Sequence, residues 1–165
     1  MNADSGTSFV AIIVGSRSDL EVVQKAKATL EQLGVGSELR VLSAHRAPDL
    51  LEQYVSGAIE RGAQVFICAA GLAAHLPGVV ASKTTLPVIG LPMPGNLAGG
   101  LDALLSIVQM PKGVPVATVG VGMAENAALL AAQMIGLHDE RVARAVAGHR
   151  AEARRHIAED PANQG

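Results

Sequence analysis

Short apolar runs alternate with stretches of helical periodicity along this chain, and that alternation constrains the fold more than any other feature. The first run, Phe-Val-Ala-Ile-Ile-Val at 9–14, ends at Gly15 and is typical of a strand that is buried on both faces. Helical periodicity follows from Leu20 to Leu33 and stops at Gly34. Strands that alternate with helices imply right-handed crossovers and a parallel sheet covered by helices on both faces.

The same pattern predicts the other elements. Expected strands lie at 9–14, around Leu39 and Val41, and at 65–68, 86–90 and 115–119. Expected helices lie at 20–33, at 48–59 with Pro48 in the first turn, from near Pro77, at 101–108, from 125, and in a charged stretch to about Ile157. The predicted fold class is α/β: a three-layer αβα sandwich with a five-stranded parallel sheet, flavodoxin-like and doubly wound. We expect one domain, 1–165, with a core at about 9–137, a C-terminal helix at about 138–157 and a tail at 158–165, frayed over 161–165.

The composition restricts both the core and the class of ligand. Hydrophobic residues make up 49% of the chain but aromatic residues only 2%, so Val, Leu, Ile and Ala must build the interior. So few rings argue against stacking on bases, and a formal net charge of −2 gives no reason to expect nucleic acid or a membrane surface as a partner. No apolar run reaches the length of a membrane-spanning helix.

Cysteine usage and the first residues indicate a cytoplasmic protein. Cys68, the single cysteine, lies in an apolar run and is expected to be a buried, inert thiol rather than a nucleophile. Residues 1–8 lack the basic start and long apolar core of a secretory signal.

The segment Ser-Ala-His-Arg-Ala-Pro-Asp at 43–49 places a candidate proton shuttle beside a candidate anion clamp. An unperturbed histidine titrates near neutrality, so His45 could both give and take a proton. The Arg46 guanidinium offers a fork of donors that suits a phosphate or a carboxylate. The alternative is a surface loop in which both side chains merely face water.

Two further polar loops follow other predicted strands. Residues 15–19, Gly-Ser-Arg-Ser-Asp, come after the first strand, and residues 70–78 come after the third. Because ligands of open parallel sheets bind outside the carboxyl ends of the strands, all three loops are expected on one edge. Ser16 and Ser18 offer hydroxyls to an anion near a helix N-terminus, and Asp19 suits a sugar hydroxyl. Ser18 or Asp19 could instead be the N-cap of that helix. The loop is neither a Walker loop nor Gly-x-Gly-x-x-Gly, so a small anionic molecule fits better than ATP or a dinucleotide.

The third loop leaves alternatives open. Gly71 and Gly78 bracket small residues, so a ligand could approach the backbone closely. His75 is either a ligand contact or a satisfied structural histidine. The Pro- and Gly-containing stretch 92–95 indicates another ordered loop at the same edge.

Other site classes have little support. The five histidines have no cysteine or carboxylate at recognised ligand spacing, so no metal site is predicted. No Gly-x-Ser-x-Gly elbow supports a serine hydrolase, and the loops offer no aromatic side chain to a flavin. The Ala-rich stretch 125–132 is apolar around most of its circumference and needs cover on several sides. That cover is either a neighbouring subunit or its own closely packed sheet.

Four motifs in register resemble those of the PurE family, the bacterial-type N5-carboxyaminoimidazole ribonucleotide mutases. They are residues 15–19, 43–49, 73–78 (Ala-Ala-His-Leu-Pro-Gly) and 106–111 (Ser-Ile-Val-Gln-Met-Pro), and the similarity covers roughly 9–137. The resemblance implies a ribonucleotide substrate whose carboxylate moves from N5 to C4 of the aminoimidazole in purine biosynthesis. It also implies no metal and no organic cofactor.

The resemblance assigns roles to residues. His45 is similar to the general acid/base, which protonates the nitrogen as CO2 departs and then removes the C4 proton. The phosphate is expected at the first loop and Arg46, with Asp19 close to the ribose hydroxyls, and loop 71–75 is expected to confine CO2. The candidate substrate-binding residues are Ser16, Ser18, Asp19, Ser43, Arg46, Gly71, Leu72, His75 and Leu76. Family members form octamers, so a homo-octamer is expected, with 109–111 and the Ala-rich helix at or near subunit contacts.

The chain departs from the family pattern at two places. Leu72 stands where the family usually has a second glycine, and 120–126 is shorter than in many relatives. Two rival functions are a direct aminoimidazole ribonucleotide carboxylase that uses CO2 and the same histidine, and a non-catalytic nucleotide-binding module.

Overall fold

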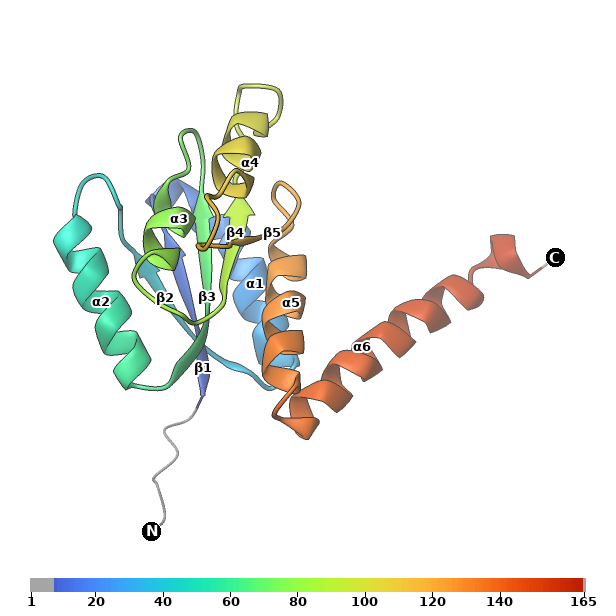
Figure 1. The fold of residues 1–165 in the computed structure, drawn as a ribbon. Helices are drawn as coiled ribbons and strands as arrows, with labels where there is room; N and C mark the ends of the chain where they lie inside the picture. The colour runs from blue at the N-terminus through green and yellow to red at the C-terminus, as the bar shows by residue number, and fades with distance from the viewer. Residues whose placement is uncertain (1–7, 165) are drawn as a thin grey trace, which may run out of the picture.

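The computed structural model of the protein describes residues 8–164 and contains one five-stranded parallel sheet between two layers of helices (Figure 1). The strands are β1 (Phe9–Val14), β2 (Gly36–Val41), β3 (Ala63–Ala70), β4 (Val88–Pro92) and β5 (Ala117–Thr118), in the order β2-β1-β3-β4-β5. The helices are α1 (Leu20–Gln32), α2 (Pro48–Glu60), α3 (Leu76–Ala81), α4 (Leu101–Val108), α5 (Ala124–Gly136) and α6 (Glu140–Ala158). Two short 3-10 helices, η1 (Arg17–Asp19) and η2 (Pro161–Asn163), complete the described chain.

The two faces of the sheet have separate cores because successive strand side chains point to opposite faces. Val10, Ile12 and Val14 of β1 pack in the core that contains α1, α5 and the first part of α6. Ala11 and Ile13 of the same strand pack in the core that contains α2, α3 and α4. The predicted three-layer αβα sandwich is confirmed, as is the burial of β1 on both faces.

The strand order fixes where a ligand site can form. From β1 the chain crosses to β2 on one side, and the later strands add on the other side, beginning with β3. The carboxyl ends of β1 and β3 are therefore the switch point of the sheet, where the crevice of an open α/β fold lies. This order is the flavodoxin-like one, as predicted.

Three predicted strands are wrong in their bounds: β3 is Ala63–Ala70 rather than 65–68, and prolines explain the other two. The fourth strand is Val88–Pro92 rather than 86–90, because Pro87 has no N–H and contributes only a carbonyl, which accepts from the Phe66 N–H at 3.0 Å. The fifth strand is limited to Ala117–Thr118 rather than 115–119. Pro115 cannot donate to the ladder, although the Val119 N–H still donates to the Gly90 carbonyl at 3.1 Å.

The expected frayed tail is also wrong for the residues that the structure describes. Pro161–Asn163 form a 3-10 turn, which the Asp160 carboxylate caps by accepting from the Ala162 N–H at 2.9 Å. Gly165 lies outside the described residues.

The Ala-rich helix α5 packs within its own chain. Its alanines at 124, 127, 128, 131 and 132 are fully buried in the core shared with α1 and the sheet. Gly136 at its end lets α6 approach closely, since a Cβ there would lie 3.3 Å from the Ala143 backbone. Close packing on its own sheet is therefore one source of cover, while cover by a second copy stays a prediction.

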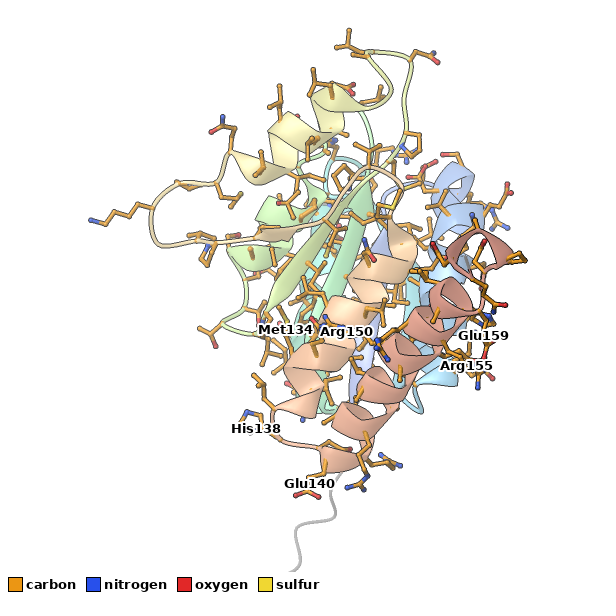
Figure 2. The ribbon with its side chains drawn as sticks, turned by 90° about the vertical axis from the view of Figure 1, so that its right-hand side faces the viewer. Met134, His138, Glu140, Arg150, Arg155 and Glu159 are labelled. Atoms are coloured by element: carbon orange, nitrogen blue, oxygen red, sulfur yellow. The ribbon has the colours of Figure 1, made fainter. Side chains whose placement is uncertain are left out.

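Helix α6 extends away from the domain (Figure 1). Among its residues only Val142 and Val146 are buried, and both lie in its first two turns. Figure 2 shows His138 and Glu140 at the turn that follows α5, and Arg155 and Glu159 at the far end of α6. Within residues 8–164, no helix is both long enough and apolar enough to cross a membrane.

Candidate active site

The predicted site residues meet in one cavity of about 500 Å³ at the carboxyl edge of the sheet. The lining includes all the residues proposed from the sequence: Ser16, Ser18, Asp19, Ser43, His45, Arg46, Gly71, Leu72, His75 and Leu76. The loops after β1, β2 and β3 supply them, as the switch-point rule predicts. The expected loop after β4 also reaches the cavity through Pro94 and Gly95.

Some lining residues were not singled out from the sequence. They are Ala44, Ala70, Ala74 and Met93. Met93 follows β4 directly, so its place after a strand end was the available signal. The alanines carry no chemical signal in a sequence, because their contribution is to leave space.

The first loop is organised by Ser16. Its side-chain oxygen accepts from the Ser18 N–H at 3.4 Å and caps η1. The Ser18 hydroxyl lies 2.9 Å from Ser16 Oγ and 3.0 Å from Asp19 Oδ1, and its single proton can serve only one of them. Asp19 occupies the N-cap position of α1, but its carboxylate makes no capping hydrogen bond. Asp19 is therefore the N-cap residue by position, as one of the two alternatives predicted, but its carboxylate bonds no helix N–H and is left for another partner.

Arg46 joins the first and second loops. Its Nη2 donates to the Gly15 carbonyl at 2.9 Å and its Nε donates to Ser43 Oγ at 3.3 Å. These acceptors are uncharged, so the contacts orient the guanidinium without neutralising it. A neighbouring hollow is lined by Gly15, Ser16, Ser43, Arg46 and also Arg17, which the sequence analysis did not single out. The positive end of the site is thus suited to an anion.

His45 and His75 form a direct pair across loops that are 30 residues apart in sequence. Nε2 of His45 lies 2.7 Å from Nδ1 of His75, and the two rings meet edge to face at 90°. One of these nitrogens must donate and the other accept, so the pair fixes the position of one proton. His75 therefore lies in the cavity and has a hydrogen-bond partner within the protein, and its contact with a ligand stays a prediction.

Gly78 allows the fourth sequence motif to approach the third loop. A Cβ at this position would lie 3.1 Å from Met110 Sδ, which is closer than nearly all real contacts of this kind. Met110 of the fourth motif therefore packs against Gly78 of α3, the helix that begins at Leu76.

Cys68 and Tyr54, whose pKa values are shifted, lie outside this cavity. Burial strongly raises the pKa of the Cys68 thiol, and Cys68 is fully buried, so the prediction of an inert thiol is confirmed. Burial, followed by the Glu38 carboxylate, raises the pKa of Tyr54 to about 12. Among residues 8–164 there is no cluster of three or more His, Cys, Asp or Glu side chains arranged to hold a metal ion.

Comparison with known proteins finds similarity along most of the chain. The sequence model described as AIR carboxylase matches residues 9–156. An N5-carboxyaminoimidazole ribonucleotide mutase of Saccharolobus solfataricus is 54% identical over 134 residues, which is 81% of this chain and 85% of that protein. A chloroplastic phosphoribosylaminoimidazole carboxylase of Vigna aconitifolia is 53% identical over 136 residues, 82% of this chain but 24% of that protein. The crystal structure of Treponema denticola PurE superposes with a TM-score of 0.86 at 29% identity, covering 95% of this chain and 98% of that one.

Proposed function

This chain belongs to the AIR carboxylase family, which includes PurE, and from that premise we propose that it is an N5-carboxyaminoimidazole ribonucleotide mutase of purine biosynthesis. The enzyme is an isomerase that converts N5-carboxyaminoimidazole ribonucleotide into 4-carboxyaminoimidazole ribonucleotide. The observation that carries the proposal is one cavity in which a histidine pair adjoins a loop with an oriented arginine. Relatives with this name are about half identical to the chain, including those of Thermotoga maritima at 49% and Mycobacterium tuberculosis at 56%.

The reaction needs one group that first gives and then takes a proton. As the N5–carboxyl bond breaks, its electron pair stays on nitrogen, His45 protonates that nitrogen, and CO2 is released beside the ring. C4 then attacks CO2, a carbon–carbon bond forms, and His45 removes the C4 proton. The protons balance over the cycle, and an imidazole is suited to both half-steps.

His45 is paired with His75 through only one ring nitrogen. Within residues 8–164 its Nδ1 makes no hydrogen bond, so that nitrogen is open to a ligand. His75 holds the ring orientation of His45 in this proposal and is a substrate-binding residue, together with Gly71, Leu72 and Leu76.

The polar end of the cavity is the proposed site of the ribose phosphate. Arg46, Ser16, Ser18 and Ser43 would hold the phosphate, because the guanidinium is oriented by neutral acceptors and keeps its charge. The Asp19 carboxylate, which makes no capping hydrogen bond, would accept hydrogen bonds from the ribose hydroxyls. The proposed reaction uses no metal and no organic cofactor.

We also propose that the protein associates with itself, as a homo-octamer. Leu101, Leu105 and Val108 share one face of α4 and are each about half exposed, which is an apolar stripe that a second copy would cover. Helix α6 carries five arginines and two glutamates, and it extends away from the domain after its first turns. It is therefore suited to contact an acidic surface on a second copy of the chain. The chain as a whole has a formal net charge of −2, so the part outside α6 is acidic. No nucleic acid partner is proposed.

The cytoplasm is the proposed location. The single cysteine is buried and unpaired, which fits a reducing compartment.

A substrate assay tests the function. The purified protein is given N5-carboxyaminoimidazole ribonucleotide without ATP, or free aminoimidazole ribonucleotide with high bicarbonate. The mutase proposal expects rapid turnover of the first substrate. Turnover only of the second would instead establish a direct carboxylase, the candidate that the Vigna aconitifolia relative's name favours. Nucleotide binding without turnover of either substrate would indicate a non-catalytic binding module.

A further inference from the structure

Leu72 is unfavourable at its position in two separate respects. Its backbone has φ 56°, in the left-handed region that favours glycine, and among residues 8–164 the only other non-glycine residue with positive φ is Ala98. Its side chain is 73% exposed, although leucine gains free energy from burial. Glycine would form the same turn without strain, so the fold alone gives no reason for leucine here.

The location of Leu72 indicates what the side chain contributes. It lines the same cavity as His45 and His75. Leu76 and Met93, the other long apolar side chains of this lining, are already buried. Of these three side chains, Leu72 is therefore the one that remains exposed and that a bound molecule could cover. Backbone strain of this kind clusters at active sites and ligand-binding segments.

We propose that Leu72 closes the active site, its side chain lying against the bound heterocycle and keeping water and bicarbonate away from the reacting carboxyl group. The inference rests on the proposed mutase function. In that reaction the carbon–nitrogen bond breaks before the carbon–carbon bond forms, so CO2 is free beside the ring for part of the cycle. CO2 that escapes leaves aminoimidazole ribonucleotide behind, and an apolar cover that excludes water reduces this loss.

The proposal distinguishes the side chain from the turn. If only the turn mattered, glycine or asparagine at 72 would serve as well or better, since both tolerate the left-handed conformation. If the apolar side chain matters, both substitutions weaken the closure, and asparagine does so with the same number and branching of side-chain heavy atoms as leucine. Methionine keeps an apolar side chain and should preserve the closure.

The test follows an isotope through single turnovers of the full-length protein. The substrate carries ¹³C in its carboxyl group, the buffer contains unlabelled bicarbonate and carbonic anhydrase, and mass spectrometry measures how much product keeps the label. An enzyme-free sample corrects for spontaneous loss. We expect L72G and L72N to lose label roughly fivefold more often per turnover than the wild type, a factor that corresponds to part of the burial energy of a leucine.

Matched controls separate closure from other causes. L72M and L137N should retain label like the wild type, because Leu137 is 78% exposed but lies outside the cavity lining. Equal label retention in L72N, L72G and the wild type would overturn the proposal. A changed molecular mass of L72N in light scattering would also overturn it, because Leu72 would then be a contact between copies. Failure of the wild type to turn over the substrate would instead refute the mutase function, before any variant is compared.

Discussion

A substitution at Gly90 would test how far the packing between β4 and α4 contributes to the free energy of unfolding of this domain. A Cβ at Gly90 would lie 2.3 Å from Ile107 Cγ2 and 2.9 Å from Val116 Cγ1. Both neighbours are β-branched and stiff, so neither side chain can swing away cheaply. The strand cannot shift either, because Gly90 pairs with Cys68 on one side and Thr118 on the other.

We expect Gly90→Ala to lower the free energy of unfolding by about 3 kcal/mol, the upper end of the usual cost of overpacking a core. With a urea m-value of about 2 kcal/mol/M, the midpoint should fall by about 1.5 M with no change in slope. Urea unfolding followed by circular dichroism, at one fixed protein concentration, measures this change. Gly148→Ala is the control: its Cβ would meet nothing within 4 Å in α6, so it should stabilise the helix by about 0.5–1 kcal/mol.

A double-mutant cycle attributes the effect to the named contact. Ile107→Ala alone should cost about 2–5 kcal/mol because it leaves a cavity. In combination with Gly90→Ala it should cost much less, since the new methyl group occupies the space that the isoleucine leaves. A Gly90→Ala protein as stable as the wild type, or additive costs in the double variant, would refute the packing argument.

Three further predictions concern the site and α6. His45→Asn should lower turnover by about 10²–10⁴-fold, the usual contribution of a general acid/base, with nucleotide affinity nearly unchanged in calorimetry; retained turnover would remove His45 from the mechanism. Arg46→Lys should weaken binding of inorganic phosphate and of nucleotide by roughly tenfold, because lysine cannot donate to the Gly15 carbonyl and Ser43 Oγ while also holding an anion; unchanged affinity would contradict the clamp. Asp139→Ala should lower the urea midpoint at pH 7, where the stabilisation is complete, by more than at about pH 2.5, which lies well below the ordinary pKa of about 4. Hydrogen bonds from Arg141, and then from the Val142 N–H, hold the folded-state pKa of Asp139 low, so its stabilisation is present above the unfolded pKa and lost as pH falls; an equal midpoint difference at both pH values would contradict this.

Most of the fold could be predicted from the sequence because the relevant signals are local. The continuous apolar run of β1 by itself indicates a strand that is buried on both faces. Pro48 begins α2 because proline at the first helical position loses no hydrogen bond. The strand-end rule then brought all the predicted site residues to one edge. The errors in the bounds of β4 and β5 fell at Pro87 and Pro115, because proline has no N–H to donate to the neighbouring strand.

The sequence alone thus determined the layers and the edge that carries the candidate site, and it indicated His45 and Arg46 as the proposed chemical groups. Only the tertiary structure decided that His45 pairs with His75, that the Ser16 side chain caps η1, and that Leu72 has a strained, exposed conformation. The reason is that periodicity and turn chemistry act over a few residues. The histidine pair, in contrast, depends on how two loops 30 residues apart are placed by the crossover connections between β1, β2 and β3.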